Sequence, residues 1–92
     1  MIVRIMEEGQ YRLEAAALDR LNQLDNAVIE AAAGGEEAGF SAAYDALLAY
    51  VRKEGSPVPD EELATSDVVL PAPDLSLFEA RGLFTGEGLV PG

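Results

Sequence analysis

The side chains that could carry acid–base chemistry in this chain are carboxylates. They occur in adjacent pairs or runs at three places, Glu7-Glu8, Glu36-Glu37 and Asp60-Glu61-Glu62. Paired carboxylates can act as general acid and base when burial or a neighbouring charge shifts one pKa. These pairs fall where the pattern indicates turns and helix starts, and acidic residues are favoured at such positions for structural reasons. We therefore expect surface charges here and no catalytic residues.

Other chemistry is excluded by the residues that the chain lacks. It contains no histidine and no cysteine, so the commonest general base and the thiolate nucleophiles and metal ligands are missing. Asp60-Glu61-Glu62 lacks the spacing of a calcium loop. The glycines at 86 and 88 are not followed by a lysine and do not sit in a strand–helix unit. The sequence predicts no enzyme activity, no metal site and no cofactor.

The charge balance is strongly acidic, with 17 acidic and 6 basic residues giving a net charge of -11. Such a surface repels nucleic acid and anionic lipid, so we expect no nucleic-acid partner and only indirect membrane contact. It suits high solubility alone, or attraction to a basic partner, and both interpretations stay open. The N-terminus has no signal-peptide layout and no apolar run approaches spanning length, so we expect a cytoplasmic protein.

A chain of 92 residues with 49% hydrophobic content fits one folded domain with a modest core. The predicted class is α+β. It comprises an N-terminal β-hairpin (1–13), an antiparallel helical hairpin (14–55), and a proline-rich connection that leads to a C-terminal strand–helix–strand closure (56–92). Together these parts are expected to form one small sheet-plus-helices domain.

The register of the predicted β-hairpin can be argued from its two faces. A two-residue loop at Glu8-Gly9 would mix polar and apolar side chains on both faces. A three-residue loop over 7–9 gives one apolar face and puts Gly9 where a left-handed residue is needed, so we favour it. This register places Arg4 opposite Arg12. Because like charges across a ladder repel, we expect an acidic group over them, from this chain or from a partner.

Two helices are predicted over residues 14–33 and 36–53, because apolar side chains recur there at helical spacing. Glycines at 34, 35 and 55 are the expected stops. The short connection predicts an antiparallel pair. The first apolar stripe comprises Leu18, Leu21, Leu24 or Asp25, Val28, Ala31 and Ala32; the second comprises Phe40, Ala43, Tyr44, Leu47, Leu48 and Val51.

The C-terminal part reads as a polar connection over 56–66 followed by a short strand, Asp67 to Leu70. Ser76 and Glu79 form a capping box, which predicts a short helix from Leu77 to about Thr85. The last residues, 89–91, are consistent with an edge strand, where proline is tolerated.

Two groups of side chains are candidates for partner binding. Arg4 and Arg12 could accept an acidic segment or a strand added to the sheet edge, and Tyr50 lies off the centre of its stripe, as an exposed aromatic anchor would. The second group is apolar, and its alternative role is to cover the core. The open edges of a small sheet also allow a homodimer. The apolar group comprises Leu70, Pro71, Pro73, Phe78 and Phe84.

An ordered set of short motifs runs along nearly the whole chain. It begins with MIVRI, the Gly9-Gln10-Tyr11 turn, and leucines at 18, 21 and 24 followed by Asp25. It continues with Ser66-Asp67, Val69-Leu70-Pro71, Pro73-Asp74, Leu77 and Glu79, and ends with Glu87-Gly88-Leu89-Val90-Pro91-Gly92. No single motif is specific, but in this order they resemble the PspA-associated protein family of the PspAA type.

The resemblance implies a non-enzymatic adaptor or regulator in a phage-shock-type envelope stress response. Its partner would be PspA, a helical membrane-associated protein related to membrane-remodelling ESCRT-like polymers. The protein would then lie in the cytoplasm, at the inner membrane face through that partner. The competing hypothesis is an acidic antagonist that mimics nucleic acid or masks a basic protein such as a transcription factor.

Overall fold

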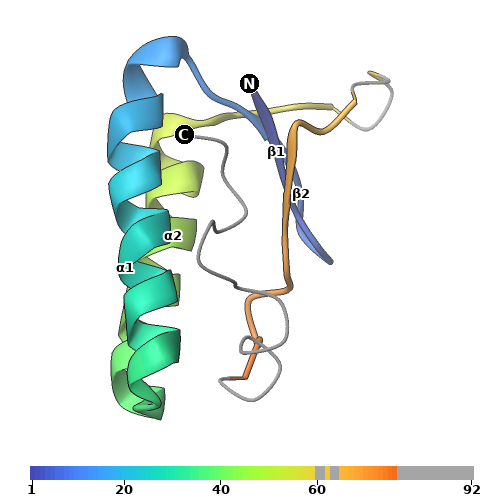
Figure 1. Ribbon diagram of the computed structural model, residues 1–92. Coiled ribbons are helices and arrows are strands. Elements are labelled where there is room, and N and C mark those ends of the chain that lie inside the picture. Colours follow the sequence, from blue (N-terminus) through green and yellow to red (C-terminus); the bar gives the residue numbers. More distant parts are fainter. Residues whose placement is uncertain (60–61, 63–64, 77–92) are drawn as a thin grey trace.

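A computed structural model describes residues 1–59, 62 and 65–76, in which two helices cover one face of a four-stranded sheet (Figure 1). The predicted α+β class is confirmed. The predicted C-terminal helix and the edge strand at 89–91 lie outside the described residues. The elements in chain order are β1 (Ile2–Ile5), β2 (Gly9–Arg12), the 3-10 turn η1 (Ala15–Ala17), α1 (Leu18–Gly34), α2 (Glu37–Glu54), β3 (Ser56–Pro57) and β4 (Val68–Leu70).

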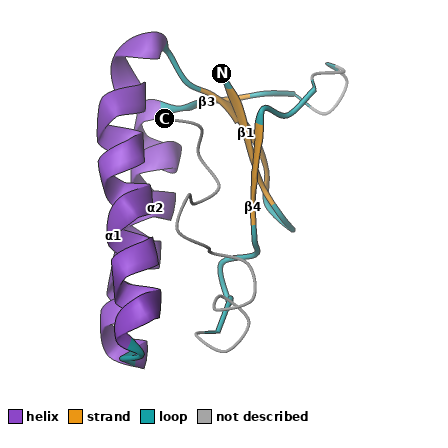
Figure 2. Ribbon diagram, in the orientation of Figure 1, coloured by secondary structure: helices purple, strands orange, loops and turns teal. Residues whose placement is uncertain are grey.

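The sheet is mixed, with strand order β3-β2-β1-β4 (Figure 2). Strand β1 runs antiparallel to β2 and parallel to β4, and β2 runs antiparallel to β3. The chain must therefore cross from one sheet edge to the other between β3 and β4. It contacts the sheet on the way, because Gln10 Nε2 donates to Ser66 Oγ at 2.8 Å and Arg12 pairs with Glu62 at 3.0 Å.

The third strand, Ser56–Pro57, was not expected, since the sequence predicted only a polar connection there. It pairs Tyr11 with Pro57 at the sheet edge. Proline has no N–H to donate, so it fits an edge strand and not a central one. Val58 then donates its N–H to the Gln10 carbonyl at 3.0 Å, which extends the contact by one residue.

The predicted hairpin register is wrong by two residues. The observed pairs are Arg4 with Gln10 and Ile5 with Gly9, around a three-residue loop over 6–8. A slip of two residues preserves the alternation of side chains, so the predicted apolar face is nevertheless correct. Arg12 lies opposite Ile2, and the predicted repulsion between two facing arginines does not arise.

The physical reason for this register lies at the two ends of the hairpin. At the open end, Leu13 N donates to the Met1 carbonyl at 2.8 Å and the Met1 amino group donates to the Leu13 carbonyl at 3.0 Å, which adds one pair to the ladder. At the turn, Glu7 and not Gly9 takes the left-handed conformation, with φ of 68°. Gly9 is the first residue of β2 and has a φ angle of 146°, which residues with a side chain rarely adopt.

The helical hairpin follows the prediction closely. Helix α1 begins four residues later than expected, because Glu14 is extended and the three alanines after it form the 3-10 turn. Gly35 closes α1 in the left-handed conformation, with φ of 73°, and its N–H bonds to the Ala32 carbonyl at 3.2 Å. Glycine reaches this conformation without the cost that a Cβ imposes.

One apolar layer between the sheet and the helices forms the core. Helix α2 buries its predicted stripe except for Ala43, which is half-buried and packs against the core. The rings of Phe40 and Tyr44 stack with centroids 5.8 Å apart. The Tyr44 hydroxyl donates to the Pro71 carbonyl, which ties α2 to the residue after β4, and burial raises the pKa of Tyr44. The fully buried side chains include Val3, Ile5, Leu13, Leu21, Val28, Phe40, Tyr44, Leu47, Leu48, Val51 and Leu70.

A carboxylate also enters this core. The first apolar stripe left Leu24 and Asp25 as alternatives, and the structure buries Asp25, which is 1% exposed, while Leu24 is only half-buried. Asp25 follows Leu21 and precedes Val28 on the buried side of α1. The face of α1 that packs on the sheet is therefore not purely apolar.

The passage from α2 into β3 takes place over a single residue, Gly55. A Cβ at this position would lie 2.5 Å from the Val51 carbonyl oxygen and 2.8 Å from the Tyr11 Cβ. The φ angle of Gly55 is an ordinary -83°. Glycine is therefore required by the close approach of helix and strand and not by backbone conformation.

We expect Gly55→Ala to lower the free energy of unfolding by about 1–3 kcal/mol, because the added methyl group forces helix and strand apart. Gly39→Ala is the matched control, because Gly39 lies within α2 and its added Cβ would meet only the Glu36 Cδ, at 3.9 Å. That control should raise stability by up to about 1 kcal/mol. Urea-induced unfolding followed by circular dichroism measures both, and an equal response of the two variants would contradict the argument.

Candidate functional site

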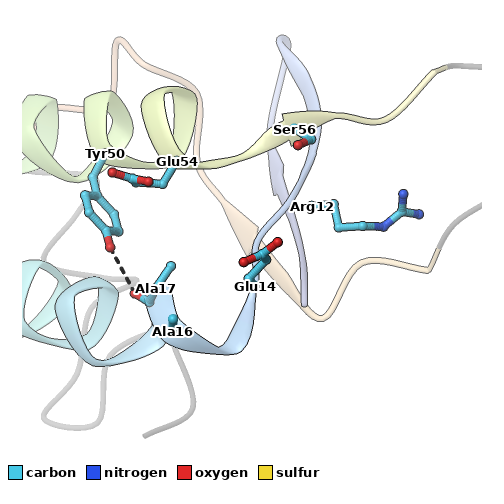
Figure 3. A pocket seen from close by; sticks show the side chains of 7 residues that line it. All are labelled: Arg12, Glu14, Ala16, Ala17, Tyr50, Glu54 and Ser56. Atoms are coloured by element: carbon cyan, nitrogen blue, oxygen red, sulfur yellow. Dashed lines mark hydrogen bonds between the residues drawn. The ribbon is translucent and has the colours of Figure 1, made fainter.

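A pocket of about 220 Å³ lies where β2, the start of the helical hairpin and the end of α2 meet (Figure 3). Two of the residues predicted for partner binding, Arg12 and Tyr50, lie on its wall together. They are 38 positions apart in sequence and meet because β3 brings the chain after α2 back beside β2. The lining residues are Arg12, Glu14, Ala16, Ala17, Tyr50, Glu54 and Ser56.

Tyr50 forms the aromatic wall of the pocket. Its side chain is half-buried and packs against the core, while its hydroxyl donates to the Ala17 carbonyl at 3.3 Å (Figure 3). This bond links the last turns of α2 to the turn that precedes α1. The ring is thus held at both ends, as an aromatic residue with an apolar body and a polar tip usually is.

Arg12 lies at the rim of the pocket and forms an ion pair within the chain. Its Nη2 atom lies 3.0 Å from Glu62 Oε1, and both side chains are about half exposed, at 52% and 45%. Figure 3 shows the guanidinium directed away from Tyr50 and Glu54. The acidic group expected over this arginine therefore comes from the chain itself. Arg4 is exposed and forms no ion pair with any of the residues described.

Two exposed carboxylates, Glu14 and Glu54, supply the remaining charge of the pocket. Neither forms an ion pair within residues 1–59, 62 and 65–76. Glu14 precedes the first helical turn, where an acid is electrostatically favoured, but Glu54 ends α2, where the helix dipole favours a cation. The described lining of the pocket therefore carries a surplus of negative charge.

The arginine of the same helical turn, Arg52, is occupied elsewhere. Its guanidinium holds the Glu8 carboxylate with N···O distances of 2.6, 2.9 and 3.1 Å, and the Tyr11 hydroxyl donates to Glu8 at 2.7 Å. The hydrogen bonds from Arg52, with a smaller contribution from Tyr11, lower the pKa of Glu8 to about 2. The bond to Glu8 in turn raises the pKa of Tyr11. This cluster fastens the β-hairpin turn to the end of α2.

Comparison with known proteins identifies the family. A family model described as "PspA-Associated protein", PspAA, matches residues 1–92. The chain belongs to the PspAA family. The motifs from MIVRI to the C-terminal glycine thus led to the correct family, whose name denotes association with PspA. No curated protein and no solved structure matches the chain.

The other predicted contact residues of this PspAA chain are separated by the fold. Leu70 is fully buried and packs in the core. Covering the core was the alternative role predicted for the apolar group to which Leu70 belongs. Pro71 is half-buried, and Pro73 is exposed. Phe78 and Phe84 lie outside the described residues. Their predicted role in partner binding stays a prediction.

The sequence reasoning missed the two glutamates and Ser56 of the pocket. Glu14 and Ser56 carry no signal of their own, because acids before helices and serines in connections are common. Glu54 does carry one, since it ends a helix where lysine or arginine is favoured. Among the residues described, no group of side chains is arranged to hold a metal ion, and no helix is both long and apolar enough to cross a membrane.

The Glu8–Arg52 pair predicts a pH dependence of stability. The folded pKa of Glu8, about 2, lies below its ordinary value of 4.5, so its contribution is complete above about pH 4.5 and is lost as the pH falls toward 2. At neutral pH, Glu8→Gln should lower the free energy of unfolding by up to about 1 kcal/mol, because the pair is partly exposed. The difference from wild type should shrink through this window.

Urea-induced unfolding at a series of pH values from neutral to acidic measures this convergence. Glu7→Gln is the matched control, since it removes a carboxylate from the same turn that is in no ion pair with the described residues. Its difference from wild type should show no convergence of this kind. A Glu8→Gln difference that stays constant down to the lowest pH would show that the carboxylate does not stabilise the fold through its charge.

Proposed function

We propose that this protein is a non-enzymatic adaptor that binds a PspA-type helical, membrane-associated protein in an envelope stress response. The observation that carries the proposal is the match of the PspAA family model to residues 1–92. The family name supports association with PspA. The role in stress, the position in the cytoplasm and the approach to the inner membrane face through the partner all rest on this association.

The charges of the fold support a basic partner. The net charge is -11, and the described ion pairs occupy Arg12 with Glu62 and Arg52 with Glu8. These two arginines form ion pairs within the chain, so most of the charged side chains that remain for contact with a partner are acidic. Complementary charge accelerates encounter and selects among partners more than it sets affinity. A long helix with basic stretches fits this surface.

Self-association through the sheet is a second arrangement compatible with the fold. Strands β3 and β4 form the two edges, and each pairs with one neighbouring strand among the described residues. Open edges can pair with a second chain. Sedimentation velocity of the purified protein separates a monomeric adaptor from a dimeric one.

The proposal predicts salt-sensitive binding to the PspA-type protein of the same organism. Isothermal titration calorimetry at about 50 and about 300 mM NaCl should show an affinity at least about tenfold weaker at the higher salt, since screening acts on exposed charges. A helical coiled-coil protein of matched length and net charge serves as the control and should bind neither strongly nor specifically. No binding at low salt would contradict the adaptor function, and salt-independent binding would contradict its electrostatic basis.

A further inference from the structure

We propose that the pocket lined by Glu14, Tyr50 and Glu54 binds a single basic side chain, arginine or lysine, of the protein partner. This inference rests on the proposed function and refines it, because it assigns the contact to a defined place and a defined chemistry. A cationic side chain on a partner helix would enter this pocket and bind there. Three properties of the site support this: its size, its charge and its aromatic wall.

The size of the cavity favours a side chain over a free ligand. Its volume is about 220 Å³, whereas pockets for drug-sized molecules and cofactors span about 300–1,000 Å³. A nucleotide or a similar cofactor would therefore remain mostly outside it. One extended arginine or lysine side chain is a more suitable occupant, with its backbone left on the partner at the surface.

The charge of the cavity selects a cation. Arg12 is the only basic residue among the described residues that line the pocket, and it is turned away and paired with Glu62. The carboxylates of Glu14 and Glu54 are left on the wall, and the C-terminal end of α2 adds the negative end of its dipole. An anion would meet repulsion from all of these groups. A guanidinium or ammonium group would be attracted by them.

Arg52 and Lys53, the basic residues in the last turn of α2, do not neutralise the negative charge of the pocket. Arg52 is held by Glu8 through three contacts of 2.6–3.1 Å, and Lys53 is not among the residues that line the cavity. Glu54 is therefore unfavourable for the helix that carries it and has no ion pair in the described structure to offset this. A cation supplied from outside would remove that unfavourable interaction at the moment of binding.

The aromatic wall adds a specific contact. The Tyr50 hydroxyl is bound to the Ala17 carbonyl, so the ring lies in a fixed position at the side of the cavity. A cation placed near the face of a tyrosine ring is attracted by its π-system. Arginine can also bind a carboxylate with two parallel hydrogen bonds, which adds geometric selectivity.

Binding of the PspA-type protein to paired variants tests the proposal. The double variant Glu14→Gln/Glu54→Gln removes the two carboxylates of the pocket. The control Glu30→Gln/Glu37→Gln removes the same charge from exposed positions near the C-terminal end of α1 and the start of α2, remote from the pocket along the helical hairpin. At fixed salt, the pocket variant should bind at least about tenfold more weakly and the control less than about threefold.

Thermal unfolding distinguishes loss of the contact from loss of the fold. Glu54 is unfavourable at a helix C-terminus, whereas Glu14 is favourable before a helical turn, so the effects of the two substitutions on stability oppose each other. The pocket variant should therefore melt within a few degrees of wild type. Equal weakening of pocket and control variants would overturn the pocket while leaving the adaptor function intact. A pocket variant that binds weakly because it melts well below wild type would also overturn it, since the two glutamates would then be structural.

A titration that needs no partner decides the question even if the adaptor function fails. N-acetyl-arginine amide is added to ¹⁵N-labelled protein and compared with N-acetyl-citrulline amide, its uncharged analogue of the same shape. The arginine compound should shift the amide signals of Glu14, Tyr50 and Glu54 in a saturable way, and the citrulline compound should not. Shifts of equal size with both compounds, or spread evenly over the acidic surface, would contradict a cation pocket.

Discussion

The missing side chain at Gly55 is the constraint on which the arrangement of sheet and helices depends. A Cβ would come within 2.5 Å of the Val51 carbonyl oxygen and 2.8 Å of the Tyr11 Cβ, so only glycine lets the end of α2 lie directly against β2. The chain can then enter β3 without a loop. Glu54 and Ser56 flank this residue, and the same close approach places both on the wall of the pocket.

The core explains why the candidate site lies at the edge of the fold. A single apolar layer lies between sheet and helices, and α2 buries Phe40, Tyr44, Leu47, Leu48 and Val51 in it. A chain of this size needs nearly all of its large apolar side chains for such a layer. Polar and charged side chains at the ends of elements are then what remains for a partner, and in the described part they are mostly acidic.

The sequence predicted those features that periodicity and glycine determine. The helical hairpin, its stop at Gly35 and the apolar face of the β-hairpin follow from such patterns. The hairpin register does not, because a slip of two residues leaves every side chain on the same face. Strand β3 contains Ser56 and Pro57, which show no alternation, and the pairing of β3 with Tyr11 and Arg12 depends on the approach at Gly55, which no local signal in the sequence reveals.

The site was predictable in its residue types but not in its assembly. Arg12 and Tyr50 were both predicted from the sequence as partner-binding residues, but only the tertiary structure places them on one pocket. Arg12 is directed away from it by its ion pair with Glu62. Glu54 is more informative, because a glutamate that ends a helix contradicts the local rule favouring a cation there. Such conflicts with a local rule tend to occur at functional positions. This one is resolved if the missing positive charge comes from the partner.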